Sequence, residues 1–331
     1  MRMRWNGKRV LVTGAGGFIG SHLVDALVEL NADVTAFVHY NARNDWGMLE
    51  ERAGAHGDRL RVVLGDVTDA SSVAAAVQEK EIVFHLAALI GIPYSYVAPG
   101  SYVDTNVRGT LHVMEACRRA RVERVVHTST SEVYGTAVYT PIDERHPLQA
   151  QSPYSASKIG ADKIAESYYC SFGVPVATLR PFNTFGPRQS ARAVIPTLIT
   201  QAFTSDTIRL GSLTPVRDLT YVEDTVQAFL RMAEADGAVG KVIHTGTGRG
   251  VTIGDLAALI ISRVNPGATL LAEEARVRPE ASEVMQLICD PSLAGTVLGW
   301  KPRVRLEEGL DRTIAWIREH LGAYKASVYT V

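Results

Sequence analysis

Short apolar segments alternate with amphipathic ones through the first half of the chain. Runs rich in valine, isoleucine and leucine predict strands at residues 8–13, 33–39, 60–64, 81–87, 124–128 and 176–180. Between them, apolar positions recur at helical spacing and predict helices at residues 21–30, 71–80, 102–119 and 153–172. Strands that are buried on both faces and alternate with helices are typical of an α/β fold with a Rossmann-like, doubly wound parallel sheet.

The pattern changes from about Pro181 onward. Glycine and proline become frequent there, and helices predicted at residues 194–203, 253–264 and 306–320 stand among irregular segments. We therefore predict a dinucleotide-binding domain over residues 1–180, with a returning segment at about 217–250. Residues 181–216 and 251–331 would form a smaller C-terminal substrate-binding lobe. Because no flexible linker separates the two parts, we expect a cleft between tightly joined lobes.

Composition narrows the class of protein. The 331 residues include 34 Lys and Arg against 35 Asp and Glu, a net charge of -1, which argues against a nucleic-acid-binding surface. The three cysteines, Cys117, Cys170 and Cys289, lie far apart, so we expect no disulfide scaffold and a reducing, cytoplasmic location. No segment approaches the roughly 20 apolar residues of a membrane helix. The nine histidines are scattered without metal-ligand spacing, so we expect no metal site.

A glycine-rich loop follows the first predicted strand. Gly14, Gly17 and Gly20 form a GxxGxxG pattern that also contains Phe18 and Ile19. In such loops the glycines permit a tight turn, close approach of a pyrophosphate, and packing of the next helix on the strand. The amino terminus of that helix attracts phosphate groups. The loop therefore predicts a bound dinucleotide, with a ligand-free tight turn as the alternative.

The choice between NAD and NADP depends on the end of the second predicted strand. No acidic residue stands there to bind the ribose of NAD. The strand ends at His39, and Arg43 follows four residues later, where an arginine can pair with a 2′-phosphate. This favours NADP, unless both are solvated loop residues. The other cofactor contacts that we expect are Asp66, Val67, Leu86, Ala87, Ala88, Thr128, Tyr154, Lys158 and Pro181.

Tyr154 and Lys158 lie four residues apart in a predicted helix, which places them on one face. A phenol, with a pKa near about 10, is a poor base at neutral pH. A nearby ammonium group favours the phenolate. Tyr154 could then remove a hydroxyl proton while a hydride leaves the same carbon.

A second polar group follows the strand predicted at residues 124–128. Thr130 and Ser131 can hydrogen-bond a sugar oxygen, and Glu132 adds a carboxylate that hydride transfer alone does not require. A carboxylate is useful where a carbon acid next to a newly formed ketone must be deprotonated. The alternative is that Glu132 caps a loop or accepts a hydrogen bond from the backbone.

These motifs together resemble a known superfamily. The segments GAGGFIG, FHLAA, TSTSEVYG, SPYSASK, RPFNTFGPRQ and RDLTYVEDTV occur in the order typical of extended short-chain dehydrogenases/reductases that modify nucleotide sugars. The longer stretches HLAALIGIPYSY, PIDERHPLQAQSPYSASKIGAD and RPFNTFGPRQSARAVIPTLITQ are similar to 4,6-dehydratases of nucleotide-linked N-acetylglucosamine in legionaminate-type pathways. The resemblance implies UDP- or GDP-N-acetylglucosamine as substrate.

The resemblance also implies a reaction sequence. Tyr154 takes the C4 hydroxyl proton as a hydride passes from C4 to the nicotinamide, and Glu132 removes the C5 proton. Water leaves from C6 with the help of Ser131 or Glu132. The hydride then returns to C6 and a proton returns to C5, which gives a 4-keto-6-deoxy sugar. The cofactor is recycled and stays tightly bound. Ser131 is shared with GDP-mannose dehydratases, whereas dTDP-glucose enzymes carry Asp there, so the proton donor to the leaving hydroxyl stays open.

Two further expectations come from the resemblance. The nucleotide diphosphate would be held by residues of the second half, although each arginine among them could instead be a solvated surface residue: Asn183, Arg188, Arg192, Arg217 and Arg278. A homodimer would form when the helices at residues 102–119 and 153–172 pair into a four-helix bundle. Packing of those helices on their own sheet explains their apolar content equally well.

Three alternatives to a 4,6-dehydratase remain. UDP-glucuronate decarboxylases carry the same Thr-Ser-Glu triplet, and a nucleotide-sugar 4-epimerase uses the same scaffold without needing Glu132. A non-catalytic dinucleotide-binding sensor is the third, because fold alone does not prove activity. A sensor predicts loss of the Tyr154–Lys158 pair or of the triplet, and both are intact here.

Overall fold

The computed structural model describes residues 5–55, 57–273, 276 and 279–324. Its largest element is a seven-stranded, entirely parallel sheet in the order β10-β6-β5-β4-β1-β2-β3. The strands are β1 (Arg9–Thr13), β2 (Asp33–His39), β3 (Leu60–Gly65), β4 (Ile82–His85), β5 (Arg124–Thr128), β6 (Val176–Pro181) and β10 (Val242–Thr245). This order confirms the predicted doubly wound α/β fold, in which ligands bind where the strand order reverses, here between β1 and β4.

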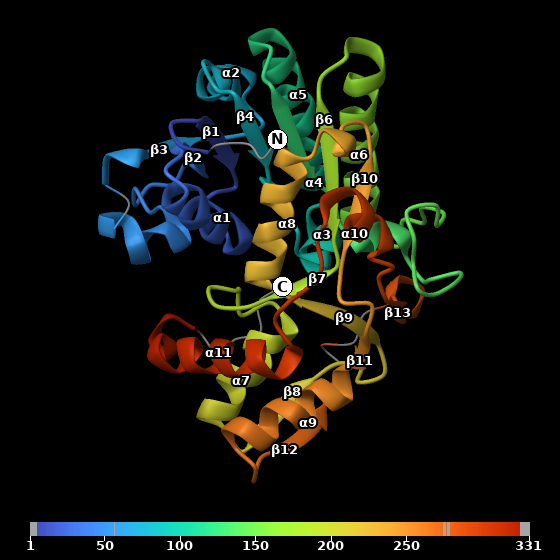
Figure 1. Cartoon of the computed structure of the whole chain (residues 1–331). Coiled ribbons are helices and arrows are strands. Elements are labelled where there is room, and N and C mark those ends of the chain that lie inside the picture. Colours follow the sequence, from blue (N-terminus) through green and yellow to red (C-terminus); the bar gives the residue numbers. More distant parts are fainter. Residues whose placement is uncertain (1–4, 56, 274–275, 277–278, 325–331) are drawn as a thin grey trace.

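Helices cover both faces of this sheet (Figure 1). On one face, α1 (Phe18–Glu29) and α8 (Val222–Glu234) bury side chains such as Leu27 and Phe229. On the other face, α2 (Ala70–Val77), α5 (Gly109–Ala120) and α6 (Pro153–Phe172) form a separate core with Val113 and Met114. Both faces of the strands are therefore buried, as their continuous apolar sequences require.

The helix predicted at residues 102–119 is not a single regular α-helix. It consists of α4 (Pro99–Tyr102), a π-helical turn η3 (Val103–Arg108) and α5, and a short helix α3 (Ile92–Val97) precedes it. Asn106 lies in the π-helical turn, where its side-chain amide exchanges hydrogen bonds with the backbone of Leu89 and donates to Ser157 at 2.9 Å. These bonds tie the turn to α6, and π-helical turns are frequent at functional sites.

The second half of the chain adds a lower lobe (Figure 1). Its helices and strands include α7 (Val194–Thr204), β8 (Thr207–Leu210), α9 (Ile253–Val264), β12 (Thr269–Ala272) and α11 (Leu306–Glu319). A second sheet joins β9 (Val216–Tyr221) to β7 (Asn183–Phe185), β11 (Gly250–Thr252) and β13 (Gln286–Leu287). Helix α10 (Ser292–Leu298) and the 3-10 turns η1 (Gly47–Ala55), η2 (Gly57–Arg59), η4 (Ser131–Tyr134), η5 (Asp236–Ala238), η7 (Glu280–Ser282) and η8 (Leu321–Ala323) complete the described elements.

The predicted returning segment, residues 217–250, divides between the two sheets. Helix α8 and strand β10 join the large sheet, whereas β9 belongs to the second sheet. The division of the chain into domains stays a prediction.

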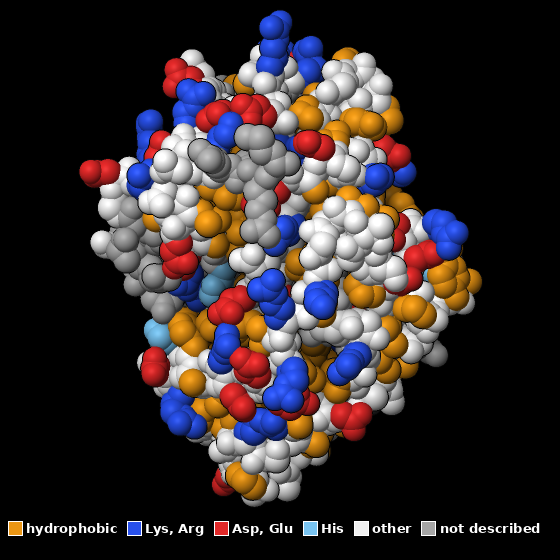
Figure 2. Space-filling model, viewed as in Figure 1, with side chains coloured by type: hydrophobic (Ala, Val, Ile, Leu, Met, Phe, Trp, Pro, Cys, Tyr) orange, Lys and Arg blue, Asp and Glu red, His pale blue; other side chains and the backbone are white. Residues whose placement is uncertain are grey.

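Charged side chains of both signs are mixed over the face seen in Figure 2, in keeping with a net charge of -1. Within the described ranges, no helix is both long and apolar enough to cross a bilayer. In the same part of the chain, no group of three or more His, Cys, Asp or Glu residues is arranged to hold a metal ion.

Candidate active site

The glycine loop connects β1 to α1 at the reversal of strand order. Gly14 has φ +70°, and a Cβ there would lie 2.7 Å from the backbone nitrogen of Ala87. A Cβ at Gly20 would lie 2.2 Å from the carbonyl oxygen of Gly14. Gly17 begins α1 without a side-chain cap, so the amides of the first turn are available to a pyrophosphate. Only glycine permits this close approach of strand, loop and helix.

A Gly20→Ala variant should lose bound dinucleotide and unfold at lower temperature. Its Cβ meets backbone that cannot move aside, and overpacking of this kind costs about 1–3 kcal/mol. Thermal melting and the nucleotide content of the purified protein measure both effects. Gly100→Ala is the matched control, since nothing lies within 4 Å of its Cβ. Equal melting temperatures and equal nucleotide content would contradict the assignment.

The predicted adenosine contacts lie beside the ends of β2 and β3. The His39 ring and the Asp66 carboxylate are 3.4 Å apart, so two of the predicted residues pair with each other. Arg43 is exposed in a turn held by the Asn41 side chain, which accepts hydrogen bonds from the amides of Arg43 and Asp45. Val67 is buried behind Asp66.

The segment after β4 faces the glycine loop. The strand ends at His85 rather than at Ala87 as predicted. The Leu86 amide still donates to the backbone carbonyl of Thr13 at 3.2 Å, and the amides of Leu86 and Ala87 both donate to Thr13 Oγ1 at 3.2 Å. Thr13 is also 2.8 Å from His85 Nδ1. Burial lowers the pKa of His85 well below its usual value, so a neutral ring holds this segment. Leu86, Ala87 and Ala88 are partly exposed along the predicted cofactor path.

Tyr154 and Lys158 occupy adjacent turns of α6, and both side chains are buried. Lys158 Nζ donates to the carbonyl oxygen of Thr128 at 2.7 Å. Burial lowers the pKa of Lys158 to about 8. Burial raises the pKa of the Tyr154 phenol, while its hydrogen bond with Thr130 lowers it. The two groups thus have pKa values shifted by the same buried environment, which is typical of catalytic acid–base residues.

The Thr130–Ser131–Glu132 triplet follows β5 and meets Tyr154. Thr130 Oγ1 accepts the amide of Glu132 at 3.2 Å and begins the short turn η4. The Glu132 carboxylate is close enough to Tyr154 to raise the pKa of its phenol by charge repulsion. It is partly exposed, and no side-chain hydrogen bond to it is found among the described residues. The Tyr154 phenol and the Glu132 carboxylate are therefore two acid–base groups of one site. The residue that caps the turn is Thr130 and not Glu132.

The residues predicted to hold the diphosphate fall into different surroundings. Arg188 is buried and donates to Asp25 of α1 at 2.9 Å, so that ion pair engages its guanidinium. Arg217 is buried on β9, with Glu283 at 3.6 Å. Arg192 is exposed. Burial raises the pKa of Tyr102, which packs on Tyr154, and the charge of Arg192 partly opposes this rise. Arg278 lies outside the described residues.

Two buried oxygen atoms support a ligand site at the ends of β5 and β6. Thr128 Oγ1 and Asn183 Oδ1 are both buried without a hydrogen-bond partner in the described structure. Such atoms cost free energy unless a ligand or water satisfies them. Pro181 ends β6 and is partly exposed. Together with the glycine loop, these positions fit a nicotinamide dinucleotide lying across the switch point.

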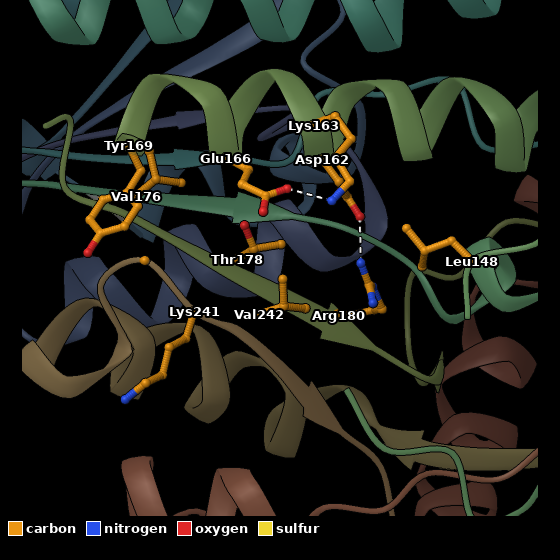
Figure 3. A pocket seen from close by; sticks show the side chains of 11 residues that line it. Leu148, Asp162, Lys163, Glu166, Tyr169, Val176, Thr178, Arg180, Lys241 and Val242 are labelled. Atoms are coloured by element: carbon orange, nitrogen blue, oxygen red, sulfur yellow. Dashed lines mark hydrogen bonds and ion pairs between the residues drawn. The ribbon is translucent and has the colours of Figure 1, made fainter. Parts of the chain in front are cut away.

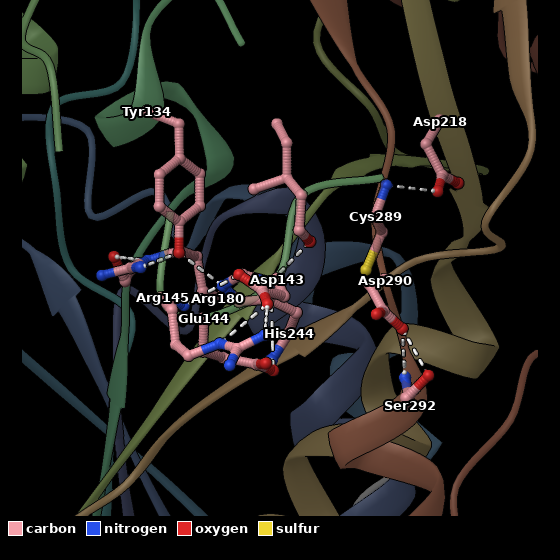
Figure 4. Close-up of polar contacts among 12 residues, drawn as sticks. Tyr134, Asp143, Glu144, Arg145, Arg180, Asp218, His244, Cys289, Asp290 and Ser292 are labelled. Atoms are coloured by element: carbon pink, nitrogen blue, oxygen red, sulfur yellow. Dashed lines mark hydrogen bonds and ion pairs between the residues drawn. The ribbon is translucent and has the colours of Figure 1, made fainter. Parts of the chain in front are cut away.

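The sequence analysis missed a buried polar cluster behind these residues. Asp162 accepts hydrogen bonds from His127, Ser129 and Arg180 at 3.0, 2.6 and 2.7 Å. Arg180 also donates to the hydroxyl of Tyr134 (Figure 4). Two features of the sequence could have indicated this cluster. Asp162 stands four residues after Lys158 on one helix face, and Arg180 is a charged residue in an otherwise apolar strand.

Fold and site together define an enzyme of the extended short-chain dehydrogenase/reductase class, with a dinucleotide cradle and a Tyr-Lys pair. A family model described as GDP-mannose 4,6 dehydratase matches residues 11–313. The chain therefore belongs to this family of NAD-dependent nucleotide-sugar dehydratases, and the prediction of an NAD(P)-dependent enzyme is confirmed.

The relatives of this chain do not all have the same activity. The chain is 32% identical over 316 residues to a dTDP-glucose 4,6-dehydratase of an Actinoplanes species, covering 94% of this chain and 98% of that protein. It is also 32% identical over 317 residues to a UDP-glucose 4-epimerase of Mycolicibacterium smegmatis, with the same coverage of 94% and 98%.

A solved structure is similar over nearly the whole chain. The dTDP-glucose 4,6-dehydratase DesIV of Streptomyces venezuelae, solved with NAD and TDP bound, has a TM-score of 0.86 and 30% identity. The match covers 96% of this chain and 99% of DesIV.

Proposed function

We propose that this protein is a nucleotide-sugar 4,6-dehydratase that acts on UDP- or GDP-N-acetylglucosamine and forms the 4-keto-6-deoxy sugar. The observation that carries the proposal is the Glu132 carboxylate beside Tyr154. Oxidation at C4 needs one proton acceptor, whereas elimination of water across C5 and C6 needs a second. The longer sequence stretches similar to N-acetylglucosamine dehydratases support the choice of sugar.

The chain's own residues divide the proton transfers between them. When bound, the nicotinamide supplies the hydride acceptor for C4 and the hydride donor for C6. Tyr154 accepts the C4 hydroxyl proton, helped by its hydrogen bond with Thr130, which opposes the rise in the pKa of the phenol that burial causes. Lys158 lies one turn further along α6 and donates to the carbonyl oxygen of Thr128. Glu132 accepts the C5 proton, which the new C4 ketone makes acidic. Ser131, buried next to it, is a candidate to assist the departure of the C6 hydroxyl.

Arg192 and Arg217 are the proposed ligands of the nucleotide diphosphate, together with Asn183. Arg192 is exposed near Tyr102, and Asn183 presents its buried, unpartnered oxygen at the start of β7. Arginine suits diphosphate because its guanidinium donates two parallel hydrogen bonds. Arg188 is left out of this ligand set because its guanidinium is buried in an ion pair with Asp25.

Product masses test the proposal. The protein, purified without added cofactor, is incubated separately with UDP-GlcNAc, GDP-GlcNAc and UDP-glucuronate. The masses of the products are then measured by mass spectrometry. Loss of one water from either GlcNAc nucleotide is expected, and the responding nucleotide identifies the base. Loss of carbon dioxide from UDP-glucuronate would instead assign a decarboxylase.

A 4-epimerase is the second candidate, because the epimerase of M. smegmatis is as similar to this chain as the dehydratase of Actinoplanes. Epimerisation leaves the mass unchanged, so the recovered sugar is separated by stereochemistry. A changed C4 configuration without loss of water would favour the epimerase.

Arg43 is expected to decide how strongly the protein binds NADP relative to NAD. An Arg43→Ala variant should bind NAD as the wild type does and bind NADP about tenfold or more weakly, since a charged hydrogen bond to the 2′-phosphate contributes about 1.5–3 kcal/mol. Titration of each nucleotide into cofactor-stripped protein measures this. Equal weakening of both would show that Arg43 does not contact the 2′-phosphate.

We also propose a homodimer that pairs α5 and α6 with the same helices of a second copy. Val103, in the turn before α5, is 52% exposed, and Phe172 at the end of α6 is 57% exposed. Large apolar side chains that remain exposed on neighbouring helices suit such a contact. The molar mass in solution tests it.

A further inference from the structure

Helix α6 contributes a third polar residue to the same face as Tyr154 and Lys158. Asp162 lies one turn beyond Lys158, and its side chain is buried. Its carboxylate accepts hydrogen bonds from His127 Nε2 at 3.0 Å and from Ser129 Oγ at 2.6 Å. Because both partners belong to the end of β5, Asp162 holds the helix against the strand that leads into the catalytic triplet.

Lys158 completes this attachment by donating to the carbonyl oxygen of Thr128, at 2.7 Å. Residues 127, 128 and 129 are thus each bound to α6 through a side chain or a carbonyl oxygen. Burial would raise the pKa of Asp162, but its hydrogen bond from His127 and the charge of Arg180 hold that pKa below its usual range. The carboxylate therefore stays charged and accepts all of these hydrogen bonds.

Arg180 extends the cluster from Asp162 to the turn that carries Glu132. Its guanidinium donates to Asp162 at 2.7 Å, donates to the hydroxyl of Tyr134, and lies 4.9 Å from the centroid of the Tyr134 ring. Tyr134 is the last residue of η4, two positions after Glu132. Figure 4 shows the Tyr134 hydroxyl directed at both Arg180 and His244, 2.5 Å from His244 Nε2.

The protonation states of Tyr134 and His244 follow from their burial. Burial raises the pKa of Tyr134 to about 12 and lowers the pKa of His244 to about 3. The hydroxyl is therefore neutral, accepts from Arg180 and donates to a neutral imidazole. A buried hydrogen-bonded network of this kind restricts the positions of the groups that it joins.

We propose that Asp162, Arg180 and Tyr134 are positioning residues that set the Glu132 turn relative to the Tyr154–Lys158 helix, and that they govern water elimination more than C4 oxidation. The proposal rests on the proposed dehydratase function. Tyr154 and Lys158 lie on one helix, which fixes their positions relative to each other, whereas Glu132 lies in η4, whose last residue is Tyr134. A displaced carboxylate slows its own proton transfer, and small displacements of catalytic groups have large effects on rate.

The position of the ion pair decides which variant to test. Asp162 and Arg180 line a small cavity between α6, β6 and β10, together with Leu148, Thr178 and Glu166 (Figure 3). Removing either charge would leave the other buried without its partner, and the protein could fail to fold. Tyr134→Phe removes only a hydroxyl and keeps the ion pair and the ring.

The test measures two rates for Tyr134→Phe holoenzyme in single turnovers with UDP-GlcNAc and GDP-GlcNAc. Quenching with borodeuteride labels every C4 ketone, so masses separate ketone that has kept its water from ketone that has lost it. We expect water loss to slow about tenfold or more and C4 oxidation to change less than about twofold. The C4 ketone that still carries its C6 hydroxyl should therefore accumulate. Tyr139→Phe, whose exposed hydroxyl donates to Asp143, is the matched control and should behave as the wild type.

Equal slowing of both steps, or no slowing, would overturn the proposal. If Tyr134→Phe does not melt cooperatively, Ser129→Ala replaces it. This variant removes the hydrogen bond from Ser129 to Asp162 and the one that Ser129 accepts from Arg180 Nε, but it keeps the ion pair between Asp162 and Arg180. The same selective loss is then expected. A wild-type protein that releases no water from either nucleotide sugar would overturn the proposed function and this proposal with it, whereas water loss by the wild type with unselective variants would overturn the positioning role alone.

Discussion

A Glu132→Gln variant is expected to lose water elimination by about 10²–10⁴-fold, the usual contribution of a general base. The amide cannot accept the C5 proton, but Tyr154, Lys158 and the glycine loop are unchanged, so C4 oxidation should continue. Because Glu132 is partly exposed and has no side-chain hydrogen bond among the described residues, the substitution should leave the melting temperature unchanged. Exchange of the C5 hydrogen with D₂O and the mass of the product measure the two steps separately.

Glu166→Gln is the control for this experiment. Glu166 is an exposed residue of α6 whose carboxylate pairs with Lys163 at 2.6 Å. It should keep wild-type rates. Water elimination by Glu132→Gln at close to the wild-type rate would remove Glu132 from the mechanism, and simultaneous loss of C4 oxidation would show that Glu132 acts before the elimination step.

The second large effect is expected for Tyr154→Phe, which should lose C4 oxidation itself by about 10²–10⁴-fold. The phenol is the only proposed acceptor of the C4 hydroxyl proton. Every later step needs the C4 ketone, so C5 exchange and water loss should fall by the same factor. This pattern differs from that of Glu132→Gln, in which oxidation survives.

Tyr168→Phe is the matched control, since Tyr168 lies on the same helix and its hydroxyl donates to Glu115 at 3.2 Å. Both variants should keep their bound dinucleotide. The assignment of Tyr154 fails if C4 ketone still forms at the wild-type rate in the Phe variant.

The large sheet was predictable because its strands are long apolar runs. The segments predicted at residues 33–39 and 124–128 agree with β2 and β5, and α6 and α9 begin and end where their patterns indicate. The strands of the second sheet were not predicted. β7, β11 and β13 have three, three and two residues, too few for periodicity to distinguish a strand from a loop.

The site was predictable where spacing alone brings residues together, as for Tyr154 and Lys158. It was not predictable where contacts depend on the tertiary fold. The pairing of Arg188 with Asp25 joins residues 163 positions apart, and that of Tyr134 with His244 joins residues 110 positions apart. Only the packing of α1 and β10 against their neighbours creates these contacts, so no local pattern indicates them.

In the proposed reaction, one hydride leaves C4 and returns to C6 of the same sugar. The most direct measurement uses UDP- and GDP-N-acetylglucosamine deuterated at C4 and locates the label in the product by NMR. We expect deuterium at C6 of a 4-keto-6-deoxy sugar. Deuterium found at C4 of a sugar with inverted configuration would contradict it and assign the protein as a 4-epimerase.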